Sequence, residues 1–152
     1  MGYDGRFTKI RMKLDNQEQL DNYYVKARNE IFDTIGRNNF YKFEGSVTNL
    51  RIDNDWTEAE LLSKVVVKAG GSKLKNYEID ACHYTYISKD ILKNFIDELK
   101  NMNLSDYYDL KTASETAIKE LEEDICNDIK KLEKLHKEFD WENDTLVFSY
   151  DY

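Results

Sequence analysis

Alternating apolar and basic positions open the chain. Apolar side chains stand at every second place against basic ones, Ile10, Met12 and Leu14 against Lys9, Arg11 and Lys13. Because successive side chains of a strand point to opposite faces, this period of two predicts a strand from about Arg6 to Leu14. We expect one face of that strand to be buried and the other to be basic and solvated.

A helical period follows directly. Asp15 suits an N-cap, and Glu18, three residues later, completes the spacing of a capping box. Apolar side chains then recur every three or four residues, at Leu20, Tyr24, Ala27, Ile31 and Ile35. This spacing predicts a helix over residues 16–35, which Gly36 ends.

The middle of the chain carries shorter patterns. Residues 40–52 predict two short strands around Gly45, although their apolar positions do not alternate cleanly. Residues 58–69 predict a helix that a Thr57/Glu60 capping box starts and Gly70 ends, with a strand at Val65–Val67 as the alternative. Residues 73–87 alternate and predict a strand with two usable faces.

The last third predicts two helices and a strand. Ser88 suits the N-cap of an amphipathic helix over 89–102, and residues 105–138 predict one long helix, with a break at 111–114 as the alternative. The chain contains 0 prolines, so the commonest helix breaker is missing. The ending DTLVFSYDY predicts a strand with Leu146, Phe148, Tyr150 and Tyr152 on one face. Its place inside the sheet or at the border stays open; at the border, Asp151 and Tyr152 would be free to meet a partner.

Strands near both ends and in the middle, separated by helices, predict an α+β fold. We expect a small, mainly antiparallel sheet covered by helices, with one long C-terminal helix followed by a terminal strand. A length of 152 residues suits a single domain over residues 1–152.

Charge changes this picture, because it is concentrated in one part of the chain. The net charge is −8, and residues 105–152 alone carry fourteen Asp and Glu against six Lys. A negative field repels nucleic acid and anionic membranes, so we expect neither as a direct partner. Two distant cysteines, and the lack of a signal segment or a long apolar run, favour a reduced, cytoplasmic protein.

Three segments resemble one group of proteins. The run NYYVKARNEIF, the segment HYTYISKDILKNFIDELKNM and the ending from Tyr107 are similar to small, acidic, tyrosine-rich phage and prophage proteins. Tyr23, Lys26 and Ala27 match that group's Tyr-Trp-Arg-Lys-Ala-Asn helix, with Tyr24 in place of the Trp, and ISKD at residues 87–90 matches its Val-Ser-Lys-Glu helix cap. The resemblance implies a phage origin, and by association the anti-defence or anti-CRISPR class, acting in the host cytoplasm.

Catalytic, cofactor and metal motifs are weak. Cys82 and His83 are adjacent, so a strand sends them to opposite faces, and His136 suits the C-terminal end of a helix. AGGSK at residues 69–73 could cradle a phosphate, but it lacks the spacing of a P-loop, and a flexible helix-to-strand turn is the favoured interpretation. The acidic segments DNDWTE at 53–58 and DWEND at 140–144 lack the spacing of a calcium loop and fit turns. We therefore expect no catalytic residue, cofactor or metal.

The acidic run in the predicted long helix is the strongest candidate for function. It would present a column of carboxylates, Glu115, Glu120, Glu122, Glu123, Asp124 and Asp128, with the tyrosine pair Tyr107 and Tyr108 before it. Such a column could occupy the basic groove of a nucleic-acid enzyme. The alternative is structural, because acid in the first half of a helix and lysine in the second half suit the helix dipole.

These features predict a non-enzymatic phage inhibitor. It would bind a host protein or ribonucleoprotein complex with a basic surface, through Glu115, Glu120, Glu123, Asp124, Asp128 and the two tyrosines. Two other functions stay open. One is a protein that sequesters a signalling nucleotide through AGGSK and the basic face of Lys9, Arg11 and Lys13; the other is an uncharacterised enzyme. Homodimerisation is also left open.

Overall fold

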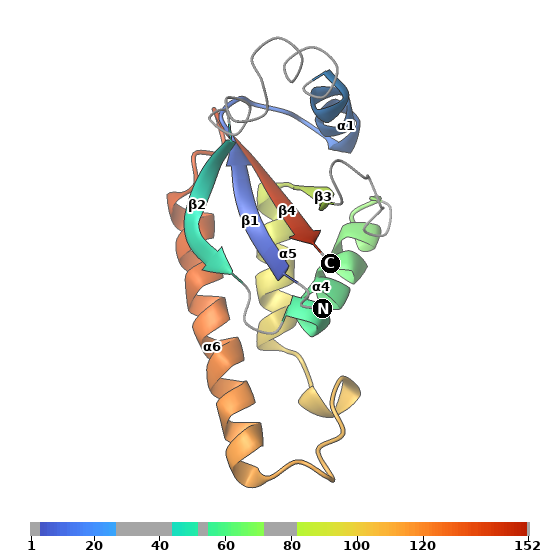
Figure 1. Ribbon diagram of the computed structural model, residues 1–152, viewed down its shortest axis with the longest axis vertical. Helices are drawn as coiled ribbons and strands as arrows, with labels where there is room; N and C mark the ends of the chain where they lie inside the picture. Colours follow the sequence, from blue (N-terminus) through green and yellow to red (C-terminus); the bar gives the residue numbers. More distant parts are fainter. Residues whose placement is uncertain (1–3, 27–43, 52–54, 72–81, 152) are drawn as a thin grey trace.

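A four-stranded antiparallel sheet organises the fold (Figure 1). The computed structural model describes residues 4–26, 44–51, 55–71 and 82–151. Its strands are β1 (Asp4–Ile10), β2 (Glu44–Arg51), β3 (Cys82–Ile87) and β4 (Thr145–Asp151). They lie in the order β2-β1-β4-β3, and every neighbouring pair is antiparallel.

The C-terminal strand β4 lies inside the sheet, between β1 and β3. Phe148 is opposite Phe7 of β1, with ring centroids 5.1 Å apart, and opposite Thr85 of β3 on the other side. Residues 145–148 are all buried, because both faces of this strand are covered. The open question about the tail is thereby answered: the strand is scaffold, not a free border.

Helices cover both faces of the sheet. The helices are α1 (Gln17–Lys26), α4 (Asp55–Lys68), α5 (Lys89–Lys100) and α6 (Glu115–Glu138), with a 3-10 turn η2 (Leu104–Asp106) between the last two. On one face Phe7, Leu146 and Phe148 join the core that α4, α5 and α6 supply. On the other face Ile10 and Val147 pack with Leu20 of α1. The predicted α+β fold, with its long C-terminal helix and terminal strand, is confirmed.

The N-terminal strand ends earlier than its pattern predicts. β1 stops at Ile10, and Met12, expected to be buried, is 47% exposed. Thr145 holds the chain where it leaves the sheet: its Oγ1 donates to the Met12 carbonyl (2.8 Å) and accepts from the Leu14 N–H (2.7 Å). This contact with β4 redirects residues that would otherwise continue the strand.

The predicted N-cap of the first helix is wrong by one residue. Asn16, not Asp15, is the cap, because its Oδ1 accepts from the Gln19 N–H (2.9 Å). Gln19 in turn accepts from the Asp15 N–H through its Oε1 (2.8 Å). A reciprocal cap is therefore present, but an amide pair forms it in place of the predicted carboxylates.

Helix α4 begins at Asp55, so the predicted Thr57/Glu60 box does not start it, and it ends as predicted at the glycines. Gly70 has φ +86°, its N–H donates to the Val67 carbonyl (3.0 Å), and the Gly71 N–H donates to the Val66 carbonyl (2.9 Å). These two bonds form a Schellman motif, which requires the left-handed conformation that glycine adopts at little cost. The alternative of a strand at residues 65–67 is wrong.

The predicted long helix from residue 105 is wrong at its start. Ser114 caps α6, accepting from the Ala117 N–H through its Oγ (3.1 Å), and the residues before it form η2 and turns. Ser88 caps α5 as predicted, with Leu92, Phe95, Ile96 and Leu99 buried.

Some predictions fall outside the described residues. They concern the second half of the first helix, the first of the two short strands around Gly45 and the start of the strand over 73–87. Within the described ranges, every helix is too short or too polar to cross a membrane.

Candidate functional site

The first half of α6 projects beyond the sheet and α5, beside the connection that carries η2 (Figure 1). Lys100, at the end of α5, has its Nζ 2.5 Å from Glu133 Oε1, so α5 ends beside the second half of α6. At 1.5 Å per residue, Glu115 lies about 27 Å further along the helix axis than Glu133. We call residues 115–124 the α6 arm.

Burial along α6 is confined to its second half. The buried side chains are Ile125, Asp128, Leu132 and Leu135. Within the α6 arm no side chain is buried, and only Ile118 and Leu121 are half-buried. Packing of the second half thus holds the helix on the core, while the α6 arm keeps its side chains available to solvent.

Five carboxylates cover the α6 arm: Glu115, Glu120, Glu122, Glu123 and Asp124, all exposed. Glu123 and Asp124 lie three and four residues after Glu120, so these three share one face of the helix. Within the described part of the chain none of the five forms an ion pair, whereas Glu133 in the second half pairs with Lys100. The arm therefore carries uncompensated negative charge.

Asp128 does not belong to this surface, so its prediction as a partner-binding residue is wrong. It is 1% exposed, and its Oδ1 lies 3.8 Å from Lys131 Nζ. The physical reason is helical spacing: Asp128 follows Ile125 by three residues and precedes Leu132 by four, which places it on the buried stripe. That spacing is visible in the sequence and would have predicted the burial.

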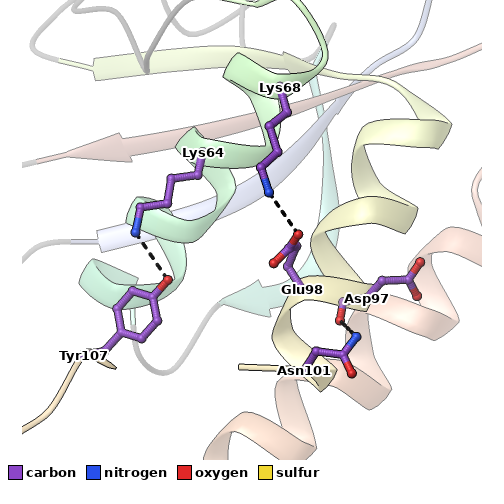
Figure 2. A network of polar contacts seen from close by, with 6 residues as sticks. All are labelled: Lys64, Lys68, Asp97, Glu98, Asn101 and Tyr107. Atoms are coloured by element: carbon purple, nitrogen blue, oxygen red, sulfur yellow. Dashed lines mark hydrogen bonds and ion pairs between the residues drawn. The ribbon is translucent and has the colours of Figure 1, made fainter. Parts of the chain in front are cut away.

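Tyr107 anchors the connection before the arm (Figure 2). Its ring packs partly buried against the core, and Lys64 of α4 lies 5.0 Å from the ring centroid and donates to the phenolic oxygen (3.4 Å). Beside it Lys68 pairs with Glu98 of α5 (3.2 Å). Tyr107 therefore engages α4 and not the carboxylates. Tyr108 is half-buried, and its backbone N–H donates to the Leu104 carbonyl (2.9 Å).

The opposite end of α6 is accounted for by local structure. His136 and Lys137 lie in the last turn, where positive charge suits the helix dipole. Trp141 packs against the His136 ring, at 6.0 Å between centroids, and its Nε1 donates to the His136 carbonyl (3.0 Å). This arrangement gives His136 a packing role.

A second feature, which no local pattern predicted, is a cleft of about 540 Å³ among α1, α4, β3 and the start of α5. Its lining comes from three distant parts of the sequence, residues 15–18, 66–71 and 84–94. Because these segments meet only in the folded chain, a pattern within one segment could not reveal it.

The predicted phosphate-contacting set is not assembled in the described structure. The N–H groups of Gly70 and Gly71 already close α4. Lys13 donates to the Trp141 carbonyl (2.7 Å), and the positive charge of Lys9 contributes to the lowered pKa of Asp140. None of the described cleft residues is a lysine or arginine. Ser72 and Lys73 of AGGSK lie outside the described residues, so the nucleotide-sequestering alternative stays a prediction.

The acidic segment over residues 140–144 is a turn, as its sequence predicts. Asp140 accepts from the N–H groups of Glu142 and Asn143 (both 3.2 Å) and from Asn143 Nδ2 (2.9 Å). The side-chain bond from Asn143 is the main reason why the pKa of Asp140 lies below 3.8. Among the described residues, no group of three or more His, Cys, Asp or Glu side chains could hold a metal ion.

Comparison with protein-family models, with curated proteins and with solved structures finds no match to this chain. The resemblance to phage proteins therefore stays a prediction.

Proposed function

We propose that this protein is a phage-encoded, non-enzymatic inhibitor that binds a basic surface on a host defence complex through the α6 arm. The observation that carries the proposal is the projecting helix with five exposed carboxylates that form no ion pair in the described structure. The phage origin rests on the sequence resemblance. The partner class rests on charge complementarity.

The charge density of the α6 arm supports a partner that binds nucleic acid. Five carboxylates and Lys119 give residues 115–124 a net charge of −4. Over the nine intervals of this helical segment, about 13 Å, that is roughly one negative charge per 3.4 Å, similar to the spacing along one DNA strand. A basic groove that binds a nucleic-acid strand would therefore find a similar density of negative charge on the α6 arm.

The position of the arm also favours a binding role. A projecting helix enters a groove without interference from the sheet, and its apolar Ile118 and Leu121 are half-exposed beside the carboxylates. Long-range attraction between such a surface and a basic groove raises association rates by about 10- to 1,000-fold, and salt screens it. At physiological ionic strength the screening length is about 8 Å, so binding should weaken as salt is raised.

The test is affinity capture from host lysate, followed by an activity assay on the captured complex. We expect the wild-type protein to capture a nucleic-acid-binding complex and to inhibit it. The variant Glu120→Lys/Glu123→Lys/Asp124→Lys should lose at least about ten-fold in association rate, because it reverses the shared face of the arm.

A matched variant, Asp97→Lys/Glu138→Lys/Glu142→Lys, controls for net charge. These three carboxylates are exposed and lie outside the α6 arm, so the control changes the total charge by the same amount. It should retain capture and inhibition. Equal loss in both variants would show an effect of net charge alone, and full inhibition by the arm variant would refute the proposed site.

A further inference from the structure

We propose that the cleft among α1, α4, β3 and α5 binds an organic cation, with an ammonium or guanidinium group on a flexible stem. This site lies at the end of the molecule opposite the α6 arm, and it is independent of the proposed inhibition (Figure 1). Its volume of about 540 Å³ falls in the range of small-ligand sites, about 300–1,000 Å³.

A side-chain bridge holds the cleft open. Gln17, in the first turn of α1, accepts from the Tyr86 N–H (2.7 Å) and from the Thr85 hydroxyl (3.3 Å) through its Oε1. Tyr86 also donates its hydroxyl to the Leu14 carbonyl (3.3 Å). These bonds fix α1 to strand β3 and leave the space between α1 and the end of α4 as a cleft.

Several donors that an anion would use are already engaged. The N–H groups of Gly70 and Gly71 bond to carbonyls of α4. At the start of α1 Asn16 accepts from the Gln19 N–H (2.9 Å), and at the start of α5 Ser88 accepts from the Ile91 N–H (3.1 Å). Helix N-termini otherwise attract anions through such groups. The carboxylates of Glu18 and Asp90, in the first turns of α1 and α5, further disfavour a phosphate or carboxylate ligand.

The lining offers negative charge instead. Asp15, Glu18 and Asp90 are exposed at the cleft, and none of them forms an ion pair within the described residues. A concave surface with three carboxylates concentrates a negative field. The rings of Tyr84 and Tyr86 add the aromatic surface that cations favour.

The ligand class is organic and not a metal ion. Within the described residues the acidic side chains are not grouped closely enough to coordinate a metal, whereas the cleft has room for a molecule. Apolar lining from Val66 and Ile91 suits the aliphatic stem of a lysine, an arginine or a polyamine. The negative charge of Asp15 acts on Tyr86 in this cleft. Burial is the main cause that raises the pKa of Tyr86 above its usual value, and the charge of Asp15 raises it further.

The test is a titration of the full chain, at low salt, followed by backbone amide NMR. The probes are N-acetyl-lysine methylamide and N-acetyl-arginine methylamide for a peptide side chain, spermidine for a free polyamine, and N-acetyl-norleucine methylamide as the neutral match. We expect saturable shifts of the Gly70, Gly71 and Tyr86 amides with the cations, and weaker binding as salt rises.

Two variants locate the site. Glu18→Gln/Asp90→Asn should weaken cation binding about ten-fold, because it removes two of the three carboxylates at the cleft. Glu120→Gln, on the α6 arm, should leave it unchanged. The salt series on the wild-type protein tests the charge dependence without any variant.

Specific results would overturn the proposal. These are the absence of saturable shifts with all three cations, equal binding of the norleucine probe, or full affinity in Glu18→Gln/Asp90→Asn. Binding of inorganic phosphate in place of the cations would overturn it as well. The arm variant Glu120→Lys/Glu123→Lys/Asp124→Lys should still bind cations. Failure of the inhibition test would therefore not decide whether the cleft binds cations.

Discussion

Replacing Thr145 by valine tests how β4 holds the N-terminal segment. Thr145 is 2% exposed, and its hydroxyl accepts from the Leu14 N–H and donates to the Met12 carbonyl. Valine keeps the shape of the side chain and removes both bonds. The Leu14 N–H, in a residue that is 6% exposed, then loses its partner.

The magnitude follows from the two groups left behind. A buried donor without a partner costs about 1–3 kcal/mol, whereas water can replace the bond to the carbonyl of exposed Met12. We therefore expect Thr145→Val to lower the free energy of unfolding by about 2 kcal/mol. Thr145→Ser keeps the hydroxyl and removes one methyl group, which costs about 0.8 kcal/mol.

Urea unfolding followed by tryptophan fluorescence and circular dichroism measures both variants. With a denaturant slope of about 1.5 kcal/mol per M, the midpoint should fall by about 1.3 M for valine and about 0.5 M for serine. If the serine variant were the less stable of the two, packing of the methyl group would dominate. The hydrogen-bond reasoning would then be refuted.

Two further predictions concern turns. Gly70→Ala should lower stability by about 1 kcal/mol, from its positive φ alone, and Gly71→Ala by about 2 kcal/mol, because a Cβ there would lie 2.6 Å from Val66 Cγ1 and 2.9 Å from the Val66 carbonyl oxygen; thermal denaturation that ranked Gly70→Ala as the worse would contradict this. The lowered pKa of Asp140 means that its charge stabilises the fold above about pH 4, and that this contribution is lost as the pH falls through the folded-state pKa. The stability difference between wild type and Asp140→Asn should therefore shrink from pH 5 to pH 2 in urea unfolding, and a constant difference would argue against it.

Local patterns predicted most elements well. The Ser88 cap and the apolar spacing after it lead to α5, and the alternation near the C-terminus leads to β4. They succeed because capping and periodicity depend on residues only a few positions apart. The same patterns placed the carboxylates of the α6 arm on an exposed helix, where the structure has four of the five predicted acidic partner-binding residues.

Errors arose where a distant segment decided the outcome. β1 ends at Ile10 because Thr145, far along the chain, binds the residues that follow it. Val147 lies on the opposite face of β4 from Leu146 and Phe148, and it is fully buried because Leu20 of α1 packs on that face as well. The error at Asp128 has a local origin instead, because its spacing from Ile125 and Leu132 already places it on the buried stripe of α6.

By itself, the sequence determined where helices and strands form and that acidity gathers in the last third. Both are properties of neighbouring residues. Only the tertiary structure decided that the terminal strand lies inside the sheet, that α6 projects as an arm and that residues 15–18, 66–71 and 84–94 enclose a cleft. Burial and enclosure depend on which surfaces meet, and surfaces meet through contacts between residues far apart along the chain.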